Sequence, residues 1–213
     1  MIIKPILFNA EMVRAILDGR KSCTRRINKD ANEYTVPDMD FYDSDKRTYA
    51  VHNYADKEHT DKLSIVERTC PICPSDILYV RESYSELSFG YVYKADGENI
   101  DHLGNLIKWH PSIHMPKEAA RIWLKVTNVR VERLQEITDE QAKREGIQYY
   151  ECPTGFTWKQ ETDMHNCYTT PIGAMQALWN STIKKSDLDS YGWDANPWVW
   201  VIEFERCEKP EGV

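Results

Sequence analysis

The sequence has no long apolar run, no segment typical of an inter-domain linker and no overall excess of positive charge. No apolar stretch approaches the roughly 20 residues needed to cross a bilayer, which argues against an integral membrane protein. Residues 1–12 lack a long apolar stretch followed by a small-residue cleavage site, so we expect a cytoplasmic protein. No stretch rich in Gly, Ser or Pro divides the 213 residues, and we predict a single domain over 1–213.

Cysteine is also sparse. Six cysteines in 213 residues are too few for a disulfide scaffold, so free thiols in a reducing compartment are expected. Cys70 and Cys73 have the spacing of a zinc knuckle, which Cys152 and Cys167 could complete. This second pair lacks the close spacing usual in such sites, so we expect packed thiols, no metal and no cofactor.

The net charge of −7 argues against a protein that coats nucleic acid non-specifically, because that binding needs many phosphate contacts. Positive charge is nevertheless concentrated near the N-terminus. Residues 1–29 hold seven Lys and Arg against Glu11 and Asp18, a local charge of +5 that leaves −12 for the rest. Such a distribution suits a compact partner, a nucleoside-like or phosphate-bearing small molecule, better than a long polyanion.

Residues Gly19 to Arg26, GRKSCTRR, combine a lysine, three arginines and three hydroxyl or thiol side chains. Just upstream, Asn9 can cap a helix over 10–18. Gly19 would end that helix, because glycine best tolerates a left-handed conformation. We therefore expect the charged segment to follow a packed helix and to face solvent or an anionic ligand.

Short strands are expected through much of the chain. Residues 2–8, which contain Pro5, suit an edge strand, and residues 77–81 read as a buried strand. Residues 91–95 suggest a further short strand. We expect two surface inserts, about 28–62 and 148–170; the first is polar, without sustained periodicity, and reads as an excursion or ordered loop.

The longest strand pattern covers 121–134, where the apolar alternation changes parity near Thr127 and Asn128. This change indicates a bulge or bend, which would let one strand turn a barrel corner. Helical patterns follow over 171–183, and residues 198–206 read as a closing strand.

Thr138 begins a capping box for a short helix that Gly146 closes. Glu145 lies in the last turn of that helix, where an acid is locally disfavoured, which hints at another purpose for it. Together the patterns predict an α+β fold: a mixed β-barrel with a few peripheral helices, in which the C-terminal strand pairs with an early one.

The stretch from Gly19 resembles the GxKxxTxR signature of the ASCH superfamily, a group of PUA-like β-barrels. Residues 77–82 (ILYVRE), 115–121 (MPKEAAR) and 193–201 (WDANPWVWV) resemble the larger ASCH proteins encoded in bacteriophages and prophages. The resemblance covers most of the chain outside the two inserts, and it implies a PUA-like fold.

The superfamily includes RNA-associated proteins, proposed ribonucleases and a small bacterial enzyme that hydrolyses N(4)-acetylcytidine. That amidohydrolase uses a lysine and a threonine of the motif together with a glutamate from the helix after the central strand. Carried over by resemblance, the catalytic residues here would be Lys21, Thr24 and Glu145.

The chemistry of these three residues is consistent with such a role. Lys21 and Thr24 are three positions apart, so only a turn can bring both to one mouth. Among the neighbouring arginines, Lys21 would take a proton from the Thr24 hydroxyl, while Glu145 orients the lysine or protonates the leaving amine. Alternatively, the cations bind phosphate and the threonine caps a turn, or Cys23 is the nucleophile.

Further residues are expected to bind the ligand. Arg81 and Glu82 end a buried strand, where polar side chains would reach the barrel rim, although a structural salt bridge is an alternative for Glu82. Two other functions stay open: a non-catalytic RNA- or nucleotide-binding module and a metal-independent ribonuclease. The candidate ligand-binding residues are Arg20, Arg25, Arg26, Arg81 and Glu82.

Overall fold

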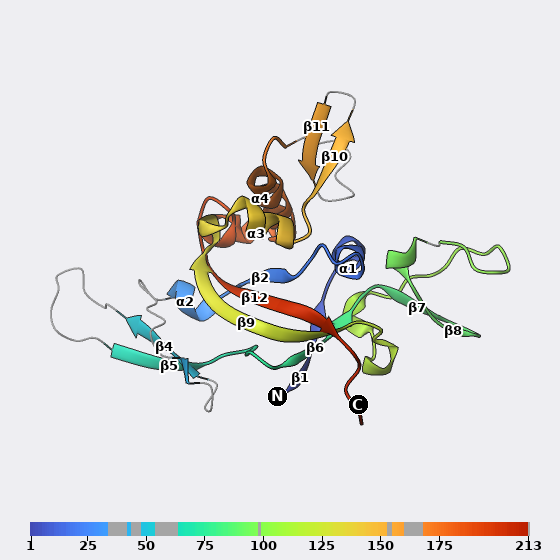
Figure 1. The fold of residues 1–213 in the computed structure, drawn as a ribbon, viewed down its shortest axis with the longest axis horizontal. Helices are drawn as coiled ribbons and strands as arrows, with labels where there is room; N and C mark the ends of the chain where they lie inside the picture. The colour runs from blue at the N-terminus through green and yellow to red at the C-terminus, as the bar shows by residue number, and fades with distance from the viewer. Residues whose placement is uncertain are drawn as a thin grey trace.

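The computed structural model describes residues 1–33, 42–43, 48–53, 64–97, 99–152, 155–159 and 168–212. Its centre is a five-stranded sheet in the order β1-β6-β9-β12-β2 (Figure 1). β1 pairs parallel to β6, and the other neighbours pair antiparallel. The strands are β1 (Ile3–Leu7), β2 (Cys23–Ile27), β6 (Ile77–Arg81), β9 (Trp123–Arg133) and β12 (Trp198–Cys207).

β1 and β2 are the two edges of this sheet, and a side chain connects them. The Nη2 atom of Arg26 on β2 donates to the carbonyl oxygen of Leu7 on β1 at 3.1 Å. In the described part of the chain, no backbone ladder joins the two edges. The predicted α+β class is therefore found, but a closed barrel is not.

The long strand β9 contains the predicted irregularity. Glu203 of β12 lies opposite Asn128, whereas the next residue, Phe204, lies opposite Val126, so Thr127 has no residue opposite it. An extra residue in one strand bends it and increases the local twist. The curved path of β9 and β12 is visible in Figure 1.

Both faces of the sheet are covered. Trp200, Ile202 and Phe204 of β12 belong to the core that also includes Val13 and Ile16 of α1 (Ala10–Leu17). The alternate residues of β12 pack into a second core with α3 (Asp139–Arg144) and α4 (Pro171–Thr182). Burial on both faces explains why the closing strand reads as the continuous apolar run WVWVI.

The predicted helix ends are confirmed. The Asn9 side chain accepts from the Met12 amide at 2.8 Å, and Gly19 has a φ of +75°. Thr138 and Gln141 form the capping box of α3, with the Gln141 side chain accepting from the Thr138 amide at 3.0 Å. The remaining helices are α2 (Lys29–Glu33), α5 (Leu188–Tyr191) and the 3-10 turns Lys94–Asp96, Ser112–His114, Lys117–Ala119, Leu134–Glu136 and Lys185–Asp187.

Smaller sheets project from the central one (Figure 1). Where the sequence suggested a loop over 28–62, the chain forms strands that pair with one another and with β5, which satisfies their backbone groups locally. The second insert likewise contains an antiparallel hairpin. These strands are β3 (Tyr42–Asp43), β4 (Thr48–Asn53), β5 (Ser64–Thr69), β7 (Tyr84–Leu87), β8 (Gly90–Tyr93), β10 (Gln148–Cys152) and β11 (Gly155–Lys159).

Gly146, which ends α3, lies where α1 and the motif meet. Its φ is +103°, and a Cβ there would lie 3.1 Å from the Cβ of Ala15. We expect Gly146→Ala to lower the free energy of unfolding by about 2 kcal/mol or more, because backbone strain and overpacking add. Gly97→Ala is the control, since its φ of +86° is similar but no atom lies within 4 Å. Equal losses in urea denaturation would contradict a steric role for Gly146.

Candidate functional site

A tight turn carries the chain from α1 into β2. The amides of Arg20 and Lys21 both donate to the carbonyl oxygen of Ala15, at 2.8 and 2.9 Å. The left-handed conformation of Gly19 makes this turn possible. In the turn, backbone amides donate to helix carbonyl oxygens that would otherwise lack a donor. The turn directs Lys21 inward, so that its side chain is fully buried.

Glu145 is the main partner of the Lys21 ammonium group. Nζ donates to Oε2 of Glu145 at 2.7 Å, to the Glu145 carbonyl oxygen at 2.9 Å and to the Cys23 carbonyl oxygen at 2.8 Å. An ammonium group has three N–H donors, so all of them are used. The lysine is therefore held in one position by α3 and β2 together.

Arg25 holds the other oxygen of the same carboxylate. Its Nη1 donates to Oε1 of Glu145 at 3.1 Å, and its Nη2 donates to the side chains of Gln141 and Glu132 at 3.0 and 3.4 Å. Two buried cations thus flank Glu145, which offsets the unfavourable position of an acid at a helix C-terminus. Gln141 links this network to the α3 capping box, since the same oxygen accepts from Thr138.

Thr24 and Arg26 form the adjoining pair. The Nη1 atom of Arg26 donates to Oγ1 of Thr24 at 2.8 Å and to the Arg25 carbonyl oxygen at 3.0 Å. Burial lowers the pKa of Arg26 from its ordinary value, and Glu145 opposes that shift. The face of the Phe8 ring is directed toward two cations, Arg26 and Lys21. Its centroid lies 5.4 Å from Cζ of Arg26 and 5.5 Å from Nζ of Lys21.

The backbone of β2 presents further groups at the free edge of the sheet. The amide of Phe204 donates to the Ser22 carbonyl oxygen, and the amide of Asn28 donates to the Trp198 carbonyl oxygen. Along β2, the even-numbered residues therefore direct their backbone N–H and C=O groups toward β12. In an antiparallel pair the odd-numbered residues then turn theirs away. The Arg25 N–H is therefore directed toward the free edge, in the residue that follows Thr24.

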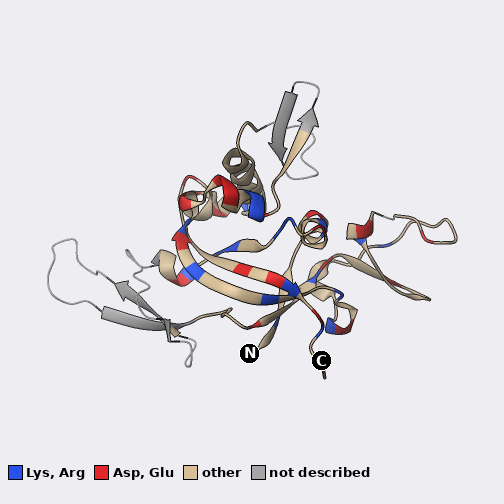
Figure 2. Ribbon diagram, viewed as in Figure 1, with Lys and Arg blue, Asp and Glu red and all other residues tan. Residues whose placement is uncertain are grey.

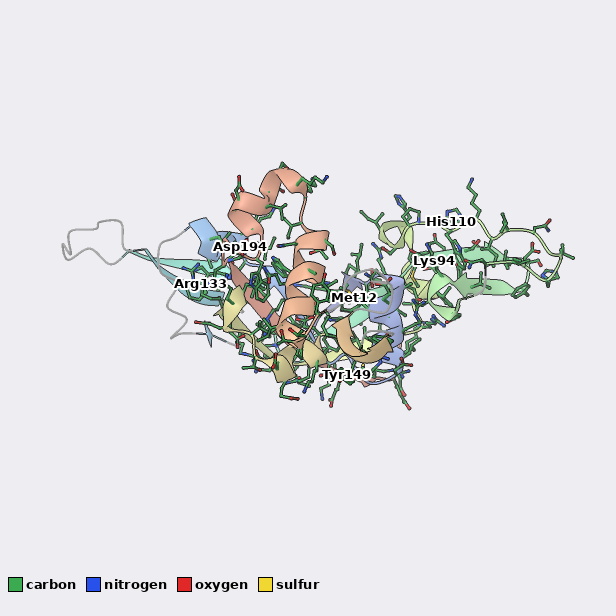
Figure 3. The ribbon with its side chains drawn as sticks, turned by 90° about the horizontal axis from the view of Figure 1, so that it is seen from above. Met12, Lys94, His110, Arg133, Tyr149 and Asp194 are labelled. Atoms are coloured by element: carbon green, nitrogen blue, oxygen red, sulfur yellow. The ribbon has the colours of Figure 1, made fainter. Side chains whose placement is uncertain are left out.

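A pocket of about 410 Å³ borders this edge. Polar groups come from β2, α3 and the start of α1, whereas α4 supplies a mainly apolar wall. Figure 3, viewed from above, labels Met12 near the middle of the molecule, between α4 and the β7–β8 arm. The lining residues are Leu7, Asn9, Met12, Thr24, Arg25, Arg26, Ile27, Glu145, Met175, Leu178, Trp179, Thr182 and Ile183.

The structure brings together only part of the predicted site. Thr24, Arg25, Arg26 and Glu145 line the pocket, and Lys21 lies directly behind Glu145. Among the described residues, no hydrogen bond joins Lys21 to Thr24, so the expected proton transfer requires one of these side chains to move. Thr24, Glu145 and Lys21 are nevertheless all within one connected group of contacts.

Arg20 points away from the pocket. Its guanidinium donates to Asp18 at 2.9 Å and to the Gly146 carbonyl oxygen at 3.3 Å. Asp18 neutralises Arg20 much as Glu145 and Glu132 neutralise the buried Lys21 and Arg25. Three of the seven cations of residues 1–29, Arg20, Lys21 and Arg25, are thus paired with carboxylates in the fold.

Arg81 and Glu82 belong to a different region, beside the β7–β8 arm. Arg81 donates to the Ile113 carbonyl oxygen at 3.1 Å, while buried Glu82 accepts two hydrogen bonds from Arg121 at 2.9 and 3.0 Å. Arg121 also pairs with Asp96 at 2.8 Å. Desolvation raises the pKa of Glu82, and Arg121 counteracts this shift. The salt-bridge alternative for Glu82 describes this geometry, and the placement of both residues at the pocket is not found.

Cys23 has the environment of a structural thiol. It is buried, and burial together with Glu145 raises its pKa to about 12. At pH 8 its thiolate is therefore scarce, which disfavours a nucleophilic role.

We expect iodoacetamide at pH 8 to leave Cys23 unmodified in the native protein and to modify it after urea unfolding, as measured by peptide mass spectrometry. Native labelling of Cys23 at the unfolded rate would contradict this assignment.

The structure does not test the zinc alternative. Cys70 and Cys73 are buried in the core against α1, whereas Cys167 and the Cys152 side chain lie outside the described residues. Within the part of the chain that the structure describes, no group of three or more His, Cys, Asp or Glu side chains is arranged to hold a metal ion. In that same part, no helix is long and apolar enough to cross a membrane.

Sequence reasoning missed two groups of residues. Gln141 and Glu132 were not singled out, because only the fold brings them to Arg25. The α4 wall was predicted only as a helical pattern over 171–183, and nothing in that pattern indicated that the helix lines a pocket.

No model of a known protein family matches the sequence, and no curated protein matches it. Among solved structures, the ASCH domain from Lactobacillus crispatus JV V101 is similar, at 9% sequence identity. The alignment covers 96% of this chain and 79% of that chain, with a TM-score of 0.41. A likeness at this level carries no argument about function, which must come from the site residues themselves.

Proposed function

We propose that this chain is an ASCH-type amidohydrolase that cleaves the exocyclic amide of an acylated nucleoside such as N(4)-acetylcytidine. The observation that carries the proposal is the buried Lys21–Glu145 pair, at 2.7 Å, behind a pocket that Thr24 lines. Buried ionisable pairs in a cleft are typical of sites that transfer protons. The GxKxxTxR resemblance supports the choice of reaction.

The proposed reaction begins with a proton shift from Lys21 to Glu145 across their short contact. Once one of the two side chains has moved to bring Lys21 and Thr24 into contact, the neutral amine takes the hydroxyl proton of Thr24, whose oxygen attacks the amide carbon. Arg26, already bonded to Oγ1 of Thr24, and the Arg25 N–H directed toward the free edge stabilise the oxyanion. The C–N bond breaks as protonated Glu145 gives its proton to the leaving amine.

The second half returns the site to its starting state. Cytidine leaves, and the acyl group remains as an ester on Thr24. Lys21 carries the proton it took from Thr24, and ionised Glu145 acts as the base for an incoming water. Attack by this water releases the carboxylic acid, and the proton that Glu145 took from the water passes to the departing Thr24 oxygen, which regenerates the hydroxyl and leaves Glu145 ionised beside protonated Lys21. No metal or cofactor is needed for any of these steps.

The compensation of positive charge disfavours the two alternative functions. Lys21 and Arg25 are buried against carboxylates, so they are poorly placed to bind the phosphates of RNA. Figure 2 shows acidic and basic residues interspersed along β9 and β12, without a basic track along these strands. Electrostatic binding of a long nucleic acid depends on such a track.

The test is incubation of the purified protein with N(4)-acetylcytidine, with cytidine and acetate measured by chromatography. We expect turnover by the wild type and a loss of at least about 100-fold in Glu145→Gln, which keeps the side-chain shape but cannot shuttle the proton. Arg20→Ala is the control, because Arg20 lies outside the pocket. If the wild type releases no acetate yet binds RNA oligonucleotides more tightly with length, the binding-module alternative replaces this proposal.

A further inference from the structure

The wall that α4 contributes to the pocket is chemically different from the opposite side. Met175, Leu178 and Trp179 face the pocket from the helix, and Ile183 follows directly after it. Across the pocket are the hydroxyl of Thr24 and the charged groups of Arg26 and Glu145. The pocket therefore separates an apolar half from a reactive, polar half.

The polar hydrogens on the α4 wall are already used. The indole N–H of Trp179 donates to the Tyr191 carbonyl oxygen at 2.8 Å. The Thr182 hydroxyl donates to the Trp179 carbonyl oxygen at 2.7 Å. A sugar or the polar edge of a base placed here would lose its hydrogen bonds to water without replacement, at a cost in binding free energy.

The other side of the pocket has donors to offer. Arg26 lines the pocket, and among the described residues its guanidinium donates only to neutral oxygens, so its N–H groups are not held by a carboxylate. The polar edge of a cytosine ring matches these donors. With the amide carbon at Thr24, the nucleoside then lies toward β2 and α1, and the acyl group points toward α4.

We propose that the α4 wall is an acyl-chain site, and that the preferred substrates carry acyl groups longer than acetyl, such as butanoyl or hexanoyl. This inference rests on the proposed function and specifies its substrate. An acetyl group has a single methyl and would leave most of this wall in contact with water. A pocket of about 410 Å³ is within the range that holds small organic ligands.

Chain length should therefore raise the specificity constant. Each methylene moved from water to an apolar wall contributes a factor of about four, so butanoyl should exceed acetyl by roughly 15-fold in kcat/KM. The measurement compares N(4)-acetyl-, N(4)-butanoyl- and N(4)-hexanoylcytidine with the wild-type protein. Highest kcat/KM for acetyl, falling with each added carbon, would overturn the acyl-chain site.

Two variants of the wall should shift this preference in opposite directions. Ile183→Phe narrows the pocket and should reduce the advantage of hexanoyl over acetyl, whereas Leu178→Ala widens it and should increase that advantage. Ser181→Phe introduces the same aromatic side chain at an exposed position of α4 outside the lining and should leave the ratio unchanged. Opposite shifts cannot arise from partial unfolding, which would lower turnover of both substrates together. Identical ratios in all three variants would overturn the proposal.

Binding measurements separate this inference from the reaction itself. Calorimetric titration of Thr24→Val with the same three ligands should give affinities that increase with chain length. If the wild type hydrolyses none of them but the affinities still increase, the reaction is refuted and the acyl-chain site stands. If acetylcytidine is hydrolysed and the affinities are flat or decrease, the acyl-chain site is refuted and the reaction stands. If neither turnover nor an increase is seen, both are refuted.

Discussion

Replacing Lys21 by Met is expected to lower the free energy of unfolding by about 3 kcal/mol or more. The side chain of Lys21 is fully buried, and it bonds to a carboxylate that is itself almost fully buried. Removing one partner of a buried pair leaves the other charge without compensation in a medium of low polarity. Arg25 remains bound to the same carboxylate at 3.1 Å and limits the loss. Urea denaturation measures the effect.

Lys143→Met is the matched control. Lys143 pairs with Glu140 on the exposed face of α3 at 2.6 Å, and exposed pairs of this kind contribute less than about 1 kcal/mol. The two variants remove the same side chain and introduce the same replacement. Equal losses in the two proteins would show that burial of the Lys21–Glu145 pair does not determine its importance.

Thr24→Val is expected to reduce turnover of an N(4)-acylcytidine by about 1,000-fold or more. Valine keeps the shape of threonine but has no hydroxyl to attack the amide carbon, and loss of a nucleophile disables the groups that act with it. Stability should change little, because Arg26 keeps its hydrogen bonds to the carbonyl oxygens of Arg25 and Leu7. Steady-state kinetics and urea denaturation separate the two effects.

The covalent step supplies the control for this variant. Thr24→Ser retains a hydroxyl at the same place and should keep measurable activity. Acid quenching of the wild type during turnover, followed by mass spectrometry, should find the acyl group on the peptide that contains Thr24. Full activity of Thr24→Val, or an acyl group on another residue, would exclude Thr24 as the nucleophile.

Local signals made much of the fold predictable. Asn9, Thr138 and Gly146 mark helix ends through hydrogen bonds or backbone angles that depend on a few neighbouring residues. The bulge at Thr127 was visible because alternation along one strand changes parity wherever an extra residue is inserted. The strands of the first insert were missed, since their sequence lacks an apolar period.

The residues of the site could be predicted only where they match the motif or the helix associated with it in the resemblance. Thr24 and Glu145 line one pocket with Lys21 behind Glu145, but Arg81 and Glu82 lie elsewhere, because Arg121 holds Glu82 in another part of the fold. A position at the end of a buried strand predicts that a polar side chain reaches the edge of the core. It does not predict which neighbouring elements that side chain will contact. The α4 wall depends on packing between elements far apart in the chain, which no local pattern encodes.

The pairing of β2 has a consequence for synthesis of the protein on the ribosome. Among the described strands, the one that carries Thr24 pairs only with β12, which spans Trp198–Cys207. In a nascent chain, β2 therefore lacks this partner until residues 198–207 have been translated. Contacts between residues so distant in sequence form late and slowly. A product truncated before residue 198 would retain every residue of the GxKxxTxR motif and still lack the strand that pairs with β2, so the motif alone cannot hold this edge of the sheet in place.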